Sequence, residues 1–175
     1  MLEALGAGQQ TVLIRKGGLI EPGKGFELVS KTFVFYPTYE HQTAQFIRED
    51  CRRFFDDGFK LRAPEGRLCF SLCGNAETSW QSSRPDVVER LSAFHIYNEA
   101  FMTQRLKWQP DQPLTIVAVR AFVMPEPVEI AASPKYVGCK SWVDLEQAAP
   151  VGGCRPVLDD SVFAQRLSAM RALLE

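Results

Sequence analysis

Residues 114–124, LTIVAVRAFVM, are the clearest β-strand in the chain. Val, Ile, Thr and Phe are enriched in strands because they pack well on a pleated surface. Pro125 and Pro127 follow directly and lack the backbone N–H that a strand uses, so we expect them to end it. Arg120 lies inside the run. If it is buried it requires a carboxylate or phosphate partner, whereas a strand with one solvated face would explain the charge as simply.

Further strands and helices are predicted on both sides of this run. Stretches rich in β-branched and aromatic residues between turn signals predict strands at residues 11–16, 26–29, 31–36 and 67–73, and a loop plus strand at 138–145. Apolar residues near helical spacing predict helices at 2–6, 39–55, 86–97 and 159–174. Residues 74–85 are expected to form a polar loop, and Asp159 or Asp160 to cap the last helix.

This order of elements has no regular alternation of strand and helix, which favours an α+β fold over a doubly wound parallel sheet. We expect a mixed, mainly antiparallel sheet or a small barrel with flanking helices. With 175 residues, of which 46% are hydrophobic and 23% charged, the chain has the size and composition of one globular domain. We assign residues 1–175 to a single domain, with its core in 1–150 and a C-terminal helix in 157–175.

The charge balance limits the possible partners. Twenty Lys and Arg residues oppose twenty-one Asp and Glu residues, for a formal net charge of −1. Proteins that coat nucleic acid through phosphate contacts are usually basic, so we expect nucleic acid or nucleotide binding only through a local patch or pocket. We expect no membrane association, because no apolar run reaches the roughly 20 residues of a spanning helix. The first residues lack the pattern of a secretory signal, which favours a cytoplasmic protein.

The five cysteines agree with a reducing compartment, because their number is odd and none belongs to a CxxC pair. Cys69 and Cys73 share one face of a predicted strand but stand about 13 Å apart along it, too far for a disulfide or a shared zinc ion. We interpret the cysteines as ordinary buried thiols. The sequence contains no GxGxxG, Walker A, HExxH or GxSxG motif, so it predicts no cofactor, no metal site and no readily recognised class of enzyme.

The segment Arg15-Lys16-Gly17-Gly18 is the first candidate for a binding site. Two adjacent cations at a strand end, followed by two glycines, can present side-chain charge and exposed backbone amides to one anion. A β-turn with solvated flanking charges is an equally simple explanation. Because successive strand residues point to opposite faces, only one of Arg15 and Lys16 is expected to face a given site.

The two histidines and one further arginine are the next candidates. His41 lies at a predicted junction of strand and helix, where the helix N-terminus favours anions and shifts pKa values; otherwise it is a surface residue of the first helical turn. His95 ends an apolar helix face, and we interpret it as a residue at the edge of the core that bonds a backbone carbonyl. Arg105 lies among apolar neighbours and raises the same question as Arg120.

Trp142 completes the set of candidates, together with Lys140 before it. A Trp beside Lys and Ser can line a pocket for a small ligand or stack on a base, but it can equally plug the core under a loop. The residues predicted to bind a ligand are Arg15, Lys16, Gly17, His41, Lys140 and Trp142.

Four strings of the sequence are shared with a known family: EALGAGQQTVLIRKGGLIE (3–21), FVFYPTYEHQ (33–42), HIYNEAFMTQRLKW (95–108) and YVGCKSWVDL (136–145). With RKGG, PTYEHQ and GCKSWV in this order and spacing, the chain resembles the bacterial family known as domain of unknown function 1802 (DUF1802), over residues 2–145. The resemblance implies a cytoplasmic prokaryotic protein and no particular activity. Members often begin further upstream, which implies an N-terminal element that is missing or reduced here.

A more distant likeness concerns the start of the chain. Gly8, Gln10, Thr11 and Arg15 loosely fit the G-x-K-T-x-E-x-R string that opens PUA-like barrels of the ASCH type. Those small barrels carry pockets for RNA or modified bases. In this chain an apolar residue replaces the glutamate, and a likeness at the level of the fold supports function only weakly.

A second distant likeness is to the restriction-endonuclease core, whose order is helix, three strands, helix, strand. Residues 2–73 are predicted to follow that order. The chemistry of that core needs an acidic residue on the second strand, where Glu27 is suitable, and an E-x-K motif on the third. Lys31 lacks a glutamate two residues before it, so an active nuclease of this type is not favoured.

Three functions remain open. The best interpretation is a ligand-binding module with a pocket for a nucleotide, a modified base or another anionic group, in which Arg15, His41 and Trp142 would converge. The first alternative is a metal-dependent phosphodiesterase or nuclease-like enzyme that uses His41 with Glu27, Glu40 or His95. The second is a protein-interaction partner without a small-molecule site.

Overall fold

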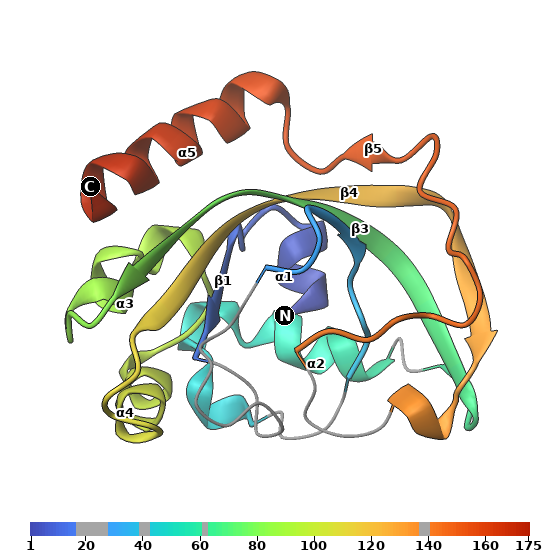
Figure 1. The fold of residues 1–175 in the computed structure, drawn as a ribbon, viewed down its shortest axis with the longest axis horizontal. Coiled ribbons are helices and arrows are strands. Elements are labelled where there is room, and N and C mark those ends of the chain that lie inside the picture. The colour runs from blue at the N-terminus through green and yellow to red at the C-terminus, as the bar shows by residue number, and fades with distance from the viewer. Residues whose placement is uncertain (17–27, 39–42, 61–62, 137–140) are drawn as a thin grey trace.

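The protein is built around a curved antiparallel sheet (Figure 1). The computed structural model describes residues 1–16, 28–38, 43–60, 63–136 and 141–175. Five strands pair in the order β1-β4-β3-β2, with β5 added beside β4. Two long strands, β3 (Arg67–Ser82) and β4 (Leu114–Ala131), arch across the molecule and carry the shorter strands. The shorter strands are β1 (Val12–Arg15), β2 (Thr32–Val34) and β5 (Arg155–Pro156).

The α+β class and the mainly antiparallel sheet predicted from the sequence are confirmed, and the small barrel is wrong. β1 and β2 lie at opposite ends of the strand order, so the sheet stays open. The order expected of a restriction-endonuclease-like core is not observed either, because Leu28 and Val29 lie outside any strand. Phe26 and Glu27, the other half of that predicted strand, fall outside the described residues.

β4 continues through Pro125 and Pro127, contrary to the sequence prediction. Both prolines lie in an interruption of the register between Val123 and Val128, the two flanking residues that pair with β3. Residues in a bulge do not donate to the ladder, so the missing N–H groups cost little there. The bulge therefore lets one strand run on where a regular ladder would have ended.

β3 also exceeds its prediction and replaces the polar loop expected at residues 74–85 as far as Ser82. Its second half alternates between exposed and partly buried residues and pairs with the most apolar part of β4, from Ser82 opposite Leu114 to Thr78 opposite Ala118. Pairing with a buried strand outweighs the turn-like composition of this segment, because strand formation depends mainly on the neighbouring strand.

The helix predicted at residues 39–55 is wrong over residues 43–52 and is found only at its end, where residues 53–55 open a later helix. In its place stand two 3-10 turns and a later helix: η1 (Ala44–Phe46), η2 (Glu49–Cys51) and α2 (Arg53–Lys60). Between the turns, Ile47 has an extended backbone and forms a β-bridge with Tyr97. That bridge uses the backbone groups a continuous helix would need. Tyr39 to Gln42 are not among the described residues.

The other predicted helices are found with changed lengths. The helix expected at 86–97 is reduced to α3 (Val87–Arg90) and a 3-10 turn, η3 (Ser92–Phe94). The N-terminal helix α1 (Leu2–Gly6) and the C-terminal helix α5 (Asp160–Leu174) are confirmed. Asp159 occupies the N-cap position of α5, but its side chain makes no capping hydrogen bond. Additional elements are α4 (Glu99–Lys107) and η4 (Pro134–Tyr136), and residues 141–145 form no strand. Within the described residues, no helix is both long and apolar enough to cross a membrane.

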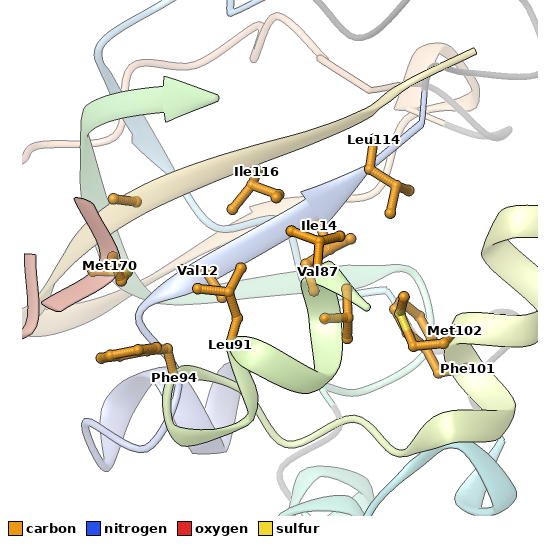
Figure 2. Packing of buried hydrophobic residues seen from close by; sticks show 12 residues of the cluster. Val12, Ile14, Val87, Leu91, Phe94, Phe101, Met102, Leu114, Ile116 and Met170 are labelled. Atoms are coloured by element: carbon orange, nitrogen blue, oxygen red, sulfur yellow. The ribbon is translucent and has the colours of Figure 1, made fainter. Parts of the chain in front are cut away.

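Apolar clusters cover both faces of the sheet. On one face, Val12, Ile14, Leu114 and Ile116 pack against α3, η3, α4 and Met170 of α5 (Figure 2). On the other face, the alternate residues of the same strands pack against α1, β2 and the segment around Trp142. The buried members of this second cluster are Leu5, Phe35, Leu72, Ala76, Val117, Val119 and Ala121. This alternation is the period-two pattern of a strand with both sides buried.

Phe35, which directly follows β2, packs its ring against β3 at Gly74, where the absence of a side chain makes room for it. A Cβ at this position would lie 2.7 Å from two ring carbons of Phe35, which is 6% exposed. We expect Gly74→Ala to lower the free energy of unfolding by about 1–3 kcal/mol, because overpacking exceeds the roughly 0.4–1 kcal/mol that alanine gains from a restricted unfolded chain. Urea unfolding would measure this loss.

The matched control is Gly152→Ala, because a Cβ at Gly152 meets nothing within 4 Å. Its free energy of unfolding should stay within about 0.5 kcal/mol of the parent. Equal stability of the two variants would show that Phe35 does not press on the backbone of β3.

Candidate functional site

The end of β1 and the last turn of α4 meet, and Arg15, Lys16 and Arg105 lie together there. Side chains alternate along β1: Val12 and Ile14 are buried, and Arg15 is partly buried on the opposite face. Lys16 returns to the face of Val12 and Ile14 and is only 2% exposed. The two neighbouring cations therefore have different environments, as the alternation of a strand predicts.

Lys16 ties the strand to the helix. Its Nζ donates hydrogen bonds of 3.1 Å to the carbonyl oxygens of Arg105 and Leu106. The last carbonyls of a helix have no amide partner inside it, and a cation also complements the negative end of the helix dipole. Burial lowers the pKa of Lys16, and the Asp111 carboxylate opposes that shift. The ammonium thus fixes the last turn of α4, with Arg105, beside the end of β1.

Arg15 and Arg105, which we call the arginine pair, are like charges near enough for the charge of Arg105 to act on Arg15. Burial and then the charge of Arg105 lower the pKa of Arg15, while Tyr97 opposes the shift. Arginine keeps its proton at any physiological pH, so the repulsion between the two groups persists. A pair of like charges held in a partly buried place is an arrangement that a bound anion would stabilise.

Arg105 also has a buried hydrogen-bond donor without an acceptor among the described residues. Its guanidinium carbon lies 5.2 Å from the ring centre of Phe101, while its Nε is buried without a hydrogen-bond partner among the described residues. A buried donor without an acceptor costs about 1–3 kcal/mol. The negative end of α4 amounts to only about half a charge, and Lys16 already bonds the carbonyls there.

Tyr97, Phe101 and Arg105 form a column, in which the two aromatic rings lie next to Arg105 of the arginine pair. The rings of Tyr97 and Phe101 are parallel within 9°, with centres 3.9 Å apart. Burial raises the pKa of Tyr97, whereas a hydrogen bond with the Gln10 side chain and the charges of Arg105 and Arg15 lower it. Phe101 and Arg105 stand four residues apart on α4 and share one helix face, a signal that our prediction did not use, whereas Tyr97 precedes α4 and forms the bridge with Ile47.

His95 is held by the backbone, as we interpreted it from the sequence. Its Nε2 donates to the carbonyl oxygen of Val88 at 2.8 Å, and its Nδ1 accepts from the amide of Tyr97 at 3.1 Å. Both ring nitrogens are therefore occupied in the neutral tautomer. Burial is the main cause that lowers the pKa of His95 to about 4, and the charge of Arg48 acts in the same direction. An imidazole bound in this way does not serve as a general base.

The other predicted site residues are only partly described. Trp142 packs in the second cluster, where its ring meets that of Phe33 edge-on with centres 5.3 Å apart. Phe33 belongs to β2, at the opposite end of the strand order from β1 and Arg15. Gly17, His41 and Lys140 lie outside the described residues. The structure thus brings Arg15 and Lys16 together with Arg105, and the wider pocket stays a prediction.

A second polar place lies between β4 and the start of α5. The Arg120 guanidinium pairs with the carboxylate of Asp160, so this arginine has the carboxylate partner that a buried position requires. A cavity of about 10 Å³ beside it has Gln10, Thr11 and Arg120 among the residues that line it. Each of the three has one buried polar atom without a partner in the described structure. This volume holds one water molecule, not a nucleotide.

Metal ligands are not gathered in the part of the chain that the structure describes. No group of three or more His, Cys, Asp or Glu side chains there could hold a metal ion. Glu27, Glu40 and His41, which the nuclease alternative needs, are not among the residues described.

The role of Lys16 can be measured through stability. In Lys16→Met the apolar stem remains, but the carbonyls of Arg105 and Leu106 lose their donor. We expect the free energy of unfolding to fall by about 1–3 kcal/mol, the cost of buried polar groups left unpaired. Lys107→Met, at an exposed position on the same turn, is the control and should stay within about 0.5 kcal/mol. If Lys16→Met left the free energy of unfolding unchanged, the ammonium would not be what fixes α4.

The burial of His95 predicts a pH dependence of stability. Its folded pKa of about 4 lies below the ordinary value of 6.5. Between these values the unfolded chain binds a proton that the folded chain does not, so stability rises with pH and is lost as pH falls. We expect the free energy of unfolding to be about 2 kcal/mol lower at pH 5 than at pH 7 because of this residue.

Urea unfolding of the parent and of His95→Gln at both pH values would isolate that contribution. The Gln amide can still donate to Val88 but does not titrate, and His41 is present in both proteins. The same pH dependence in parent and variant would contradict the assignment.

Comparisons with known proteins place these observations in a family but not in a function. Neither the curated proteins nor the solved structures contain a match for the chain. A family model, described as domain of unknown function (DUF1802), matches residues 1–169 and so includes the arginine pair and most of α5. The family predicted from the sequence strings is confirmed, and the chain belongs to DUF1802.

Proposed function

We propose that this chain is a cytoplasmic ligand-binding protein that takes an anionic group, such as the phosphate of a nucleotide, at the arginine pair. The observation that carries the proposal is the electrostatic repulsion between Arg15 and Arg105, together with one buried donor of Arg105 that has no partner among the described residues. Lys16 holds these like charges together at a cost that a bound anion would offset. The proposal keeps Arg15 as a ligand-binding residue and adds Arg105.

The geometry of guanidinium groups favours an oxyanion. Each guanidinium presents its N–H donors in a planar fork, which matches two oxygens of a phosphate or carboxylate. A ligand bearing several such oxygens can bridge both arginines and lower their repulsion. In this arrangement Lys16 is a positioning residue, because its ammonium already donates to α4.

Binding is favoured over hydrolysis by the state of His95. The hydrolytic alternative gave this residue a possible part in proton transfer, but both of its nitrogens are bonded to the backbone. A neutral imidazole with a pKa of about 4 would in any case be a weak base at neutral pH. The parts of that alternative that involve Glu27, Glu40 and His41 stay a prediction from the sequence.

The test is a thermal-shift series with pyrophosphate and with mononucleotides at millimolar concentration, each compared with chloride at the same ionic strength. At a hundredfold excess over Kd, binding stabilises the native state by about 2.7 kcal/mol, which raises Tm by several degrees. We expect Arg15→Gln and Arg105→Gln each to lose most of the shift, because each removes one of the two forks.

Arg171→Gln, an exposed position on α5, is the matched control and should keep the full shift. Chloride at equal ionic strength screens the arginine repulsion without bridging it, so it should raise Tm less than the phosphates do. Equal shifts with all anions, or an unchanged shift in both arginine variants, would exclude the arginine pair as the site.

A further inference from the structure

Two segments that are far apart in the sequence meet along the edge of β4 that faces away from β3, and Arg120 lies between them. The carbonyl oxygen of Thr11, just before β1, accepts a 2.9 Å hydrogen bond from the amide of Val119. The amide of Val157, just after β5, donates a 3.0 Å hydrogen bond to the carbonyl oxygen of Ala121. The neighbour of β4 therefore changes from one segment to the other at Arg120, and the small cavity beside this arginine lies at that junction.

The C-terminal segment borders this cavity. Val157, Leu158 and Phe163 are among the residues that line it. Leu158 lies over Gly8, where a Cβ would come within 2.6 Å of the Leu158 Cδ2 atom. Gly8 has a φ of +69°, a backbone conformation that glycine adopts readily. The turn before β1 and the segment that leads into α5 thus meet at the cavity.

Three of the lining residues each have a buried polar atom without a hydrogen-bond partner in the described part of the chain: Gln10 Oε1, Thr11 Oγ1 and Arg120 Nε. Gln10 and Thr11 are 1% and 3% exposed, so bulk solvent does not reach them. The orientation of the Gln10 amide follows from its Nε2, which donates to the carbonyl oxygen of Val12 at 2.9 Å and leaves Oε1 as the unpaired acceptor. Buried polar groups in native proteins are almost always paired, either with protein or with ordered water.

We propose that one water molecule resides in this cavity as a part of the fold and joins Gln10, Thr11 and Arg120. A water molecule donates two hydrogen bonds and accepts two. Its oxygen accepts from the Nε–H of Arg120, one of its protons goes to the Gln10 oxygen, and the Thr11 hydroxyl serves as the third partner. One molecule thereby satisfies all three atoms, and about three hydrogen bonds are usual for a buried water.

The charges and the size of the cavity favour water over an ion. The Arg120 guanidinium already has its counter-charge in the carboxylate of Asp160. An anion would be repelled by the Gln10 oxygen and could not donate to it, and a cation would face the guanidinium. A volume of about 10 Å³ holds no molecule larger than water.

A water at this place connects the two ends of the chain through one side chain. Arg120 binds the water on one side and Asp160, the first residue of α5, on the other. Gln10 and Thr11 belong to the segment that enters β1. The bound water therefore stabilises the attachment of both segments to β4, and its loss should lower the stability of the whole fold.

Two measurements on the full chain, without added ligand, test the proposal. The first is a crystal structure at a resolution that shows ordered water, in which we expect one density peak within hydrogen-bond distance of all three atoms. The second is the Tm of Thr11→Val. Valine keeps the shape of threonine but cannot bond the water, so Tm should fall by roughly 2–4 °C, the shift that one lost hydrogen bond produces in a chain of this size.

The sign of that shift separates a hydrated cavity from a dry one. In a dry cavity the hydroxyl of Thr11 has no partner, so Thr11→Val would remove an unpaired polar atom and raise Tm. The matched control is Thr78→Val, because Thr78 also lies on a strand but is only partly buried. Its Tm should stay within about 2 °C of the parent.

A Tm of Thr11→Val that equals or exceeds that of the control would overturn the proposal. A crystal structure without a peak that bonds all three atoms would do the same, and it decides the question even if Thr11→Val fails to fold. Neither outcome bears on the arginine pair.

Discussion

Every other strand of the sheet is attached to the antiparallel pairing of β3 with β4. β1 and β5 pair with β4, and β2 pairs with β3. The pairing runs from Arg67 opposite Ala131 to Ser82 opposite Leu114, with two interruptions of the register. Because each strand presents alternate residues to opposite faces, this one ladder sets which side chains enter each apolar cluster. It thereby also decides where β1 ends and where Arg15 lies.

The central strand of this ladder could be predicted from the sequence, and its partner only in part. Residues 114–124 are apolar enough to indicate a strand by themselves. The second half of β3 is polar and acquires its structure from β4, so its own composition indicated a loop. Ile47 was assigned to a helix for a related reason, since the bridge to Tyr97 that extends its backbone comes from a distant segment. Local patterns predict what a segment prefers, and these two segments follow their neighbours instead.

The candidate site, too, could be predicted from the sequence only in part. Arg15 and Lys16 were identified from adjacent cations at a strand end, and their opposite orientations follow from strand geometry. Their partner Arg105 was noted as an arginine among apolar residues, but only the packing of α4 on β1 brings it to Arg15.

The attachment of β1 to β4 also has a consequence for how the chain is made. Val12 pairs with Ala118, roughly 100 positions further along the chain. A ribosome adds about 5–20 residues per second, so β1 waits for roughly 5–20 seconds before its partner strand has been synthesised. Throughout that interval Val12 and Ile14 have no sheet to enter. The N-terminal segment of the nascent chain therefore keeps these apolar side chains without their sheet partners for that interval, and Met170 covers the same cluster only when synthesis is almost complete.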